Sequence, residues 1–310
     1  MLCNQYPIFK IRYSICLPLL MLGLVCILTS CEDEEQPPSG NIETNFQKII
    51  QLPPGIIESS GIIYLEDQYL WTHNDSGDGP VLYEVDLNGI GINRSVTIAN
   101  AVNKDWEAIT NDDTVVFVGD FGNNHGNRTD LVIYKISKTD LLSETIVSSS
   151  DIFFSYEDQI DFAISDKHNF DCEAMIPFND QLYLFTKNRG NLQTNIYQLS
   201  RNPGTQVATL HDTFDTEGLI TAAAISPDKN TICLLGYNIE EDNYNPFVWL
   251  LYDFSDTDFL GGKKVRVGLD MNKQTEAIYF KDDNTLYFTF EEEDEAPSYV
   301  YSFDVGEWME

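Results

Sequence analysis

The sequence predicts an all-β protein with a single β-propeller domain, and an internal repeat is the main reason. Five times along the chain a polar residue is followed by a small residue and then by an apolar run. These polar residues are Ser60, Glu107, Glu173, Thr221 and Glu276. They recur about 47 to 66 residues apart, which is close to the roughly 40–50 residues of one four-stranded blade.

Each repeat start predicts the innermost strand of a blade, and two further strands follow it. The second strands are rich in aromatic and β-branched residues, as strands with a buried face are. They are expected at 69–72, 115–118, 181–185, 231–235 and 286–289. The third strands are expected at 81–85, 131–136, 195–199, 248–252 and 299–303.

A fourth strand can be placed in all but the last repeat. These outer strands are expected near 94–98, 151–156, 206–210 and 265–268. The last repeat reaches Glu310 without one, and the segment 46–52 before the first repeat is its natural replacement. Such a strand would close the ring and remove an exposed sheet edge. We therefore expect five blades; a sixth remains an alternative, formed if 141–146 pairs with 152–156.

The first thirty residues are typical of a bacterial lipoprotein signal. They contain Lys10 and Arg12 but no acidic residue, and they include an apolar stretch at 15–28. Thr29 and Ser30 separate this stretch from Cys31. Cleavage before Cys31 would leave a lipid-anchored amino terminus. The alternative is an uncleaved transmembrane anchor, but the apolar stretch is shorter than the roughly 20 residues that a span needs.

The remaining chain is divided into a tether and one folded domain. Residues 31–44 are acidic and contain Pro and Gly, which predicts a flexible tether, and 45–310 form the propeller domain. We expect an outer-membrane lipoprotein of the bacterial cell envelope, attached to the membrane through Cys31. The acidic residues 32–35 resemble the surface-export signal of Bacteroidota lipoproteins, although a plain solvated linker would look the same.

Charge and cysteine content restrict the partners and the compartment. The chain has 50 acidic and 18 basic residues, a net charge of −32 at pH 7, which opposes nucleic acid as a partner. We expect a monomer.

Outside the signal and Cys31, the cysteines are Cys172 and Cys233. Both lie in apolar strand contexts and are expected to be buried free thiols, with a bridge between blades as the alternative.

The five repeat starts predict a ring of side chains around the central channel, because the first strand of every propeller blade lines it. Three of the five are carboxylates, which repel one another unless their pKa values rise or a cation binds. All five offer hard oxygen ligands, which favours Ca²⁺. The alternative is that the carboxylates cap backbone N–H groups of neighbouring blades or hold channel waters.

A second group of polar residues follows the second strands and is expected at the same mouth of the channel. It includes His73 as a candidate general base, with Asp75 and Asp120 as candidate catalytic carboxylates. The candidate ligand-binding residues are Asn74, Asn123, Asn124, Arg128, Lys187, Arg189, Tyr237 and Glu291. The three cations would hold an anion. The alternative is ordinary turn chemistry, which uses Asn, Asp and Gly.

The segments 71–77, 105–109, 118–124 and 276–278 resemble an uncharacterised family of secreted bacterial propeller proteins, grouped with phytase-like and TolB-like propellers. That resemblance implies a fold and no activity. More distantly, the repeat starts resemble those of the calcium-activated nucleotidases (apyrases), five-bladed propellers with an axial Ca²⁺. This resemblance implies that the five ring residues hold the metal. Thr221 stands where those enzymes have serine, and the loops after the second strands differ.

Two functions follow from these observations. The first is a propeller that binds a small-molecule or protein ligand at its channel mouth, with an axial Ca²⁺ for stability. The alternative is a Ca²⁺-dependent hydrolase of a phosphoester or another anionic substrate, in which the metal polarises an oxygen and His73 or Asp120 activates water.

Overall fold

The computed structural model describes residues 46–310, apart from 67, 90, 292–296 and 310. The predicted signal, tether and lipidated Cys31 therefore lie outside the described residues. Residues Asn41–Glu310 form one compact unit, and the strands and hydrophobic clusters given below all belong to it. In the described part of the chain no helix has the length and apolarity to cross a membrane.

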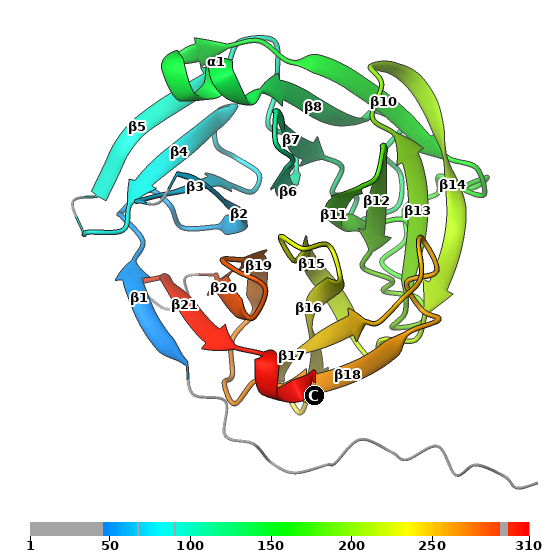
Figure 1. Ribbon diagram of the computed structural model, residues 1–310. Coiled ribbons are helices and arrows are strands. Elements are labelled where there is room, and N and C mark those ends of the chain that lie inside the picture. Colours follow the sequence, from blue (N-terminus) through cyan, green and yellow to red (C-terminus); the bar gives the residue numbers. More distant parts are fainter. Residues whose placement is uncertain (1–45, 67, 90, 292–296, 310) are drawn as a thin grey trace, which may run out of the picture. The chain divides into compact units, whose positions relative to one another are not determined.

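The described residues form five blades around a central axis (Figure 1). The innermost strands are β2 (Ser59–Glu66), β6 (Trp106–Asn111), β11 (Cys172–Phe178), β15 (Leu219–Ile225) and β19 (Thr275–Phe280). Each contacts the next one in this order, and β19 contacts β2. The propeller and its innermost strands are therefore confirmed.

The outer strands also lie where the sequence predicts them. The second strands are β3 (Tyr69–Asn74), β7 (Val115–Asp120), β12 (Gln181–Thr186), β16 (Thr231–Glu240) and β20 (Thr285–Phe290). The third strands are β4 (Val81–Asp86), β8 (Leu131–Ser137), β13 (Thr194–Ser200), β17 (Asn243–Tyr252) and β21 (Tyr299–Asp304). The fourth strands are β5 (Gly91–Ile98), β10 (Ser150–Tyr156), β14 (Gly204–Phe214) and β18 (Lys263–Gly268). Within each blade these strands pair antiparallel with their neighbours.

The last blade is completed by the first strand of the propeller, as predicted. β1 (Gln47–Gln51) pairs antiparallel with β21, with Gln47 opposite Ser302 and Gln51 opposite Tyr299 (Figure 1). Phe46 packs edge-on against Phe288 and Phe303, with ring centroids 5.5 and 5.7 Å apart. β1 therefore closes the ring and covers the edge that β21 would otherwise expose.

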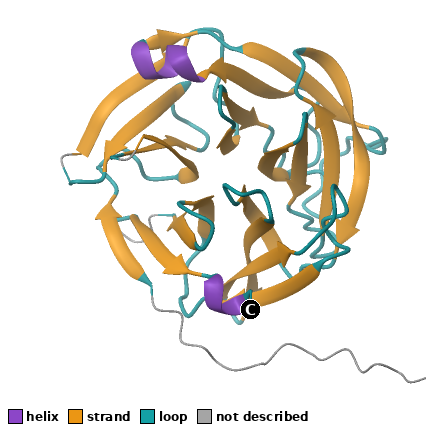
Figure 2. Ribbon diagram, viewed as in Figure 1, coloured by secondary structure: helices purple, strands orange, loops and turns teal. Residues whose placement is uncertain are grey.

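The alternative of a sixth blade is wrong. Leu141 lies in a short helix, α1 (Lys138–Ser143), and β9 (Ile146–Val147) pairs parallel with β5 on the edge of the first blade. Residues 152–156 belong to β10, which pairs with β8 and also, in parallel, with β14 of the next blade. The long insert therefore braces neighbouring blades at the rim. Figure 2 shows how little of the described domain is helical.

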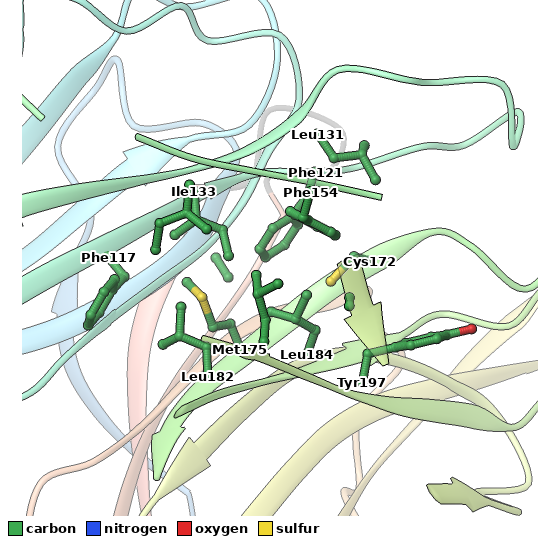
Figure 3. Close-up of a cluster of buried hydrophobic side chains, with 14 of the residues drawn as sticks. Phe117, Phe121, Leu131, Ile133, Phe154, Cys172, Met175, Leu182, Leu184 and Tyr197 are labelled. Carbon is green, nitrogen blue, oxygen red and sulfur yellow. The ribbon is translucent and has the colours of Figure 1, made fainter. Parts of the chain in front are cut away.

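The hydrophobic core lies between adjacent blades. Figure 3 shows one cluster, in which Phe117, Phe121 and Phe154 of the second blade face Met175 and Leu184 of the third. The two cysteines are buried and free, and they belong to different clusters. The prediction of buried free thiols is therefore confirmed.

Candidate functional site

Each innermost strand has a β-bulge at its predicted ring residue. In the second blade Trp106 lies opposite Asp120 and Ala108 opposite Gly119, so that Glu107 is the extra residue. The same irregularity leaves one extra residue in the other four blades: Ser60, Glu173, Thr221 and Glu276. A bulge leaves the extra residue outside the ladder and redirects its side chain. Five equivalent bulges therefore aim the ring residues at the axis.

All five ring residues are buried, and the channel is narrow where they lie. A cavity of about 10 Å³ is lined by Ser60, Glu107 and Glu173 and by the small residues that follow the ring residues, which is about the space of one water molecule. The small residues are needed for close packing. A Cβ atom on Gly61 would lie 2.7 Å from His73 Nε2 and 2.8 Å from Ile109 Cγ2.

The two hydroxyl members of the ring are bonded to backbone. Ser60 Oγ donates to the carbonyl of Glu58 at 3.2 Å. Thr221 Oγ1 donates to the carbonyl of Thr275 in the next blade at 2.7 Å. The carboxylate of Glu276 accepts a bond from Gln274 Nε2 at 2.7 Å. These contacts give the three side chains protein partners, but none of them caps a backbone N–H group.

Basic side chains neutralise the carboxylates on one side of the channel mouth. Lys187 Nζ lies 3.1 Å from Glu173 Oε2, and Arg189 NH2 lies 2.9 Å from Asp171 Oδ2 and 3.9 Å from Glu173 Oε1. Burial by itself lowers the pKa of Lys187, but attraction from Glu173 and Glu276 holds that pKa well above its usual value. This lysine is therefore charged and forms an ion pair with Glu173.

The third predicted cation is also engaged. Arg128 NH2 lies 2.8 Å from Asp120 Oδ1, and its NH1 donates to the carbonyl of Gly122 at 2.7 Å. Asp120 also accepts from the backbone N–H groups of Lys104 and Asp105. Asp120, the predicted catalytic carboxylate, and Arg128, a predicted anion-binding residue, therefore form an ion pair with each other.

The other side of the mouth carries carboxylates that form no direct ion pair in the described chain, although attraction from Arg128 opposes the rise that burial causes in the pKa of Asp105. One oxygen each of Asp75, Asp105 and Glu107 lie within 4.8 Å of one another. None of the three has a Lys, Arg or His ion-pair partner within the described residues. Asp75 Oδ1 is buried and has no hydrogen-bond partner in that same part of the chain. We call these three residues the acidic triad.

The pKa values of the triad follow from burial and mutual repulsion. Burial and the neighbouring Asp105 raise the pKa of Asp75 to about 7. Burial, with repulsion from Glu173 and Asp75, raises the pKa of Glu107 well above its usual value. Close by, burial and Glu276 raise the pKa of Glu291 to about 7. These groups favour either a shared proton or a bound cation.

The loop after β7 approaches the triad closely. A Cβ atom on Gly122 would lie 2.2 Å from Glu107 Oε1 and 2.5 Å from Asp105 Oδ2. Only a residue without a side chain leaves both carboxylates in place. Gly122 lies in the segment 118–124, which carries the family resemblance. Its lack of a side chain is therefore explained by the close approach of the two carboxylates.

His73 lies in the wall of the propeller. Its side chain is fully buried, its ring centroid is 5.7 Å from that of Trp106, and its Nδ1 is 3.0 Å from the carbonyl of Asn74. Burial lowers the pKa of His73 to about 4. The ring is therefore neutral at pH 7 and faces Gly61, and this position does not favour a role as general base at the mouth.

The predicted asparagines fix loops. Asn74 Oδ1 accepts from the backbone N–H groups of Ile57 and Glu58, and Asn123 Nδ2 donates to the carbonyl of Phe170. Asn124 Oδ1 accepts from Arg189 at 2.6 Å. These contacts join segments far apart in the chain, so the asparagines hold loops against one another and are not simply turn residues. Tyr237 does lie at the mouth, with its ring centroid 5.6 Å from Lys187 Nζ.

Several site residues were not selected from the sequence, although a signal for them exists. Asp105, Asp171 and Gln274 each stand two positions before a carboxylate of the ring. Residues two positions apart in a strand tend to share a face. The recurring polar-x-Glu pattern would therefore have predicted a second layer of polar groups beside the ring.

The chain matches no protein-family model and no curated protein. Among solved structures it is similar to a chain of "Kuenenia stuttgartiensis Hydrazine Synthase", with 13% identity and a TM-score of 0.39, over 79% of this chain and 59% of that one. It is also similar to a chain of the "Crystal Structure of Mitotic Checkpoint Complex", with 12% identity and a TM-score of 0.35, over 77% and 60%. The aligned region thus spans about three-fifths of those chains. The five-bladed fold rests on the strand pairing described above.

Proposed function

We propose that this protein is a cell-envelope lipoprotein whose propeller binds a ligand or partner at the channel mouth, and that a Ca²⁺ ion held by the acidic triad shapes that mouth. The observation that carries the proposal is that none of Asp75, Asp105 and Glu107 forms an ion pair with a basic side chain in the described chain. Glu173 and Asp120, at the same mouth, each have one.

A divalent cation would resolve the repulsion within the triad. Hard carboxylate oxygens suit Ca²⁺ better than zinc or copper, which prefer nitrogen and sulfur ligands. The three carboxylates would supply part of the six to eight oxygen ligands that Ca²⁺ takes, and the unpartnered Asp75 Oδ1 is available to it. Of the five ring residues we thus assign Glu107 to the ion and leave Glu173 to Lys187.

The contacts of the candidate catalytic residues favour binding over hydrolysis. His73 is buried in the wall, and Asp120 is paired with Arg128. Neither is placed to activate a water at the mouth. We expect no turnover of p-nitrophenyl phosphate or nucleoside triphosphates by residues 41–310 in the presence of Ca²⁺.

Thermal melting of residues 41–310 tests the ion. The protein is treated with chelator and then titrated with Ca²⁺, with Mg²⁺ in parallel. At a Ca²⁺ concentration one hundred times the dissociation constant, binding stabilises the fold by about 2.7 kcal/mol. We therefore expect a saturable rise in melting temperature that is selective for Ca²⁺. Glu107→Gln should abolish the rise, whereas Asp166→Asn, at an exposed surface carboxylate, should keep it. No selective rise would refute the ion.

A further inference from the structure

A second and larger cavity lies at the other end of the channel, where the innermost strands end. Its volume is about 240 Å³, against about 10 Å³ at the ring. Its walls include Ile62, Ile109 and Ile278 near the axis. Its rim includes Asp112, Asp113, Asn179, Arg201 and Lys229. We call it the second-mouth cavity; none of the acidic triad belongs to it.

One position in the repeat explains why this end is open. The second residue after each ring residue is Ile62, Ile109, Met175, Ala223 and Ile278 in the five blades. The four large ones are buried, whereas Ala223 is half-buried and lines the cavity. Protein interiors normally leave few voids larger than a water molecule. The fourth blade therefore leaves out the side chain that would fill this space.

Part of the rim of the second-mouth cavity is fixed by hydrogen bonds and an ion pair. Arg201 bridges two blades, because its guanidinium bonds Asp112 of the second blade and donates to the carbonyl of Asn179 in the third. Asp112 Oδ1 in turn accepts from the backbone N–H groups of Thr114 and Val115 at 2.7 and 2.8 Å. A preformed rim of this kind lowers the conformational cost of binding.

The charges around the cavity limit the ligand. The rim carries two acidic and two basic side chains, Asp112, Asp113, Arg201 and Lys229, so it has no net charge of its own. The whole chain carries −32, which disfavours an anion. The lining is mixed: Ile278, Ala223 and Phe280 contribute apolar surface, and Thr110, Asn111 and Ser226 contribute polar groups.

We propose that the second-mouth cavity binds a small amphipathic molecule that carries no net negative charge. The apolar body enters between Ile62, Ile109 and Ile278, in the space that Ala223 leaves, and a polar end meets the rim. This site is independent of the Ca²⁺ site and of the ligand proposed for the opposite mouth.

Fluorescence titration of residues 41–310 with N-phenyl-1-naphthylamine tests the proposal. This neutral aromatic probe fluoresces strongly in apolar surroundings. We expect saturable binding with one probe per chain, and at least tenfold weaker binding of the anionic analogue 8-anilinonaphthalene-1-sulfonate. Absence of saturable binding, or tighter binding of the sulfonate, would overturn the proposal.

A variant with a larger side chain at position 223 tests whether the space beside Ala223 is the binding site. Ala223→Ile restores the residue of three other blades and should weaken binding of the neutral probe at least tenfold without lowering the melting temperature. If that variant misfolds, the smaller Ala223→Val should weaken binding severalfold. Ala163→Ile, which adds the same side chain at an exposed loop position, and Glu107→Gln, at the other mouth, should leave binding unchanged. Undiminished binding in the folded Ala223 variant would refute the assignment.

Discussion

The ammonium of Lys187 lies 3.1 Å from the carboxylate of Glu173, and both side chains are almost fully buried at the channel mouth. Glu107 occupies the equivalent bulge of the preceding blade and has no such partner in the described chain. Two carboxylates that are equivalent in the repeat therefore have different electrostatic surroundings. This difference divides the mouth into a compensated side and an acidic side.

Removing the lysine should be costly. Lys187→Met leaves Glu173 buried without its cation, which typically costs about 3–5 kcal/mol, and urea denaturation measures the loss. The double variant Lys187→Met/Glu173→Gln removes the charge as well and should recover part of that stability. A loss below about 1 kcal/mol in the single variant would mean that water or Arg189 compensates Glu173 instead.

Stability should fall as the pH rises from about 5 to about 7. The folded-state pKa values of Asp75 and Glu291 are raised to about 7, so between their unfolded and folded pKa values the folded state holds more protons than the unfolded state. Each such group lowers the unfolding free energy by up to about 1.4 kcal/mol per pH unit in this window. Denaturation at several pH values, without Ca²⁺, measures the slope.

The variants Asp75→Asn and Glu291→Gln provide the control for this pH dependence. Each removes one titrating carboxyl, so the decline in stability between pH 5 and 7 should become shallower. An unchanged slope in both variants would assign the pH dependence to other groups.

Substitution of Gly122 should disturb the acidic triad. The added methyl of Gly122→Ala would overlap Glu107 and Asp105, and overpacking of this kind typically costs about 1–3 kcal/mol. We expect a lower melting temperature and a weaker response to Ca²⁺. Gly79→Ala is the matched control, since its nearest contact would be an ordinary 3.6 Å. Equal melting of the two variants would contradict the close packing at Gly122.

Removal of the closing strand should open the ring. A fragment that starts at Pro53 lacks β1 and exposes the edge of β21, so we expect a lower melting temperature and association through the free edge. Calorimetry and size-exclusion chromatography measure these effects. A fragment that starts at Phe46 keeps β1 and should behave like residues 41–310. A monomeric Pro53 fragment of full stability would show that closure contributes little.

The membrane anchor can be tested through its attachment residue. If Cys31 is lipidated, Cys31→Ser should move the protein from the membrane fraction to the soluble envelope fraction, and mass spectrometry should find no lipid on its amino terminus. Membrane retention of the serine variant would indicate the uncleaved-anchor alternative.

The blade plan could be read from the chain because the strands of a blade are consecutive and follow local rules. The spacing of the starts, the aromatic second strands and the spare segment 46–52 all indicate the five closed blades that the structure has. The insert 141–156 was ambiguous, because β9 and β10 pair with strands of the first, second and third blades, and no local pattern reveals such partners.

The roles at the mouth depended on contacts between segments far apart in sequence. His73 stands in a polar segment that looks exposed, yet it is buried because Gly61, 12 positions earlier, leaves room for its ring. Likewise, pairing of Lys187 with Glu173, and of Arg128 with Asp120, was settled by how the loops after the second strands fold back.

The sequence alone thus determined the propeller, its closing strand and the ring of oxygen-bearing side chains, and it favoured five blades over six, because strand periodicity and repeat spacing are local properties. Only the tertiary structure decided which carboxylates are neutralised, which remain as the acidic triad, and that the second mouth is hollow at Ala223. Burial, ion pairing and unfilled volume depend on distances between residues from different blades, which no single repeat encodes.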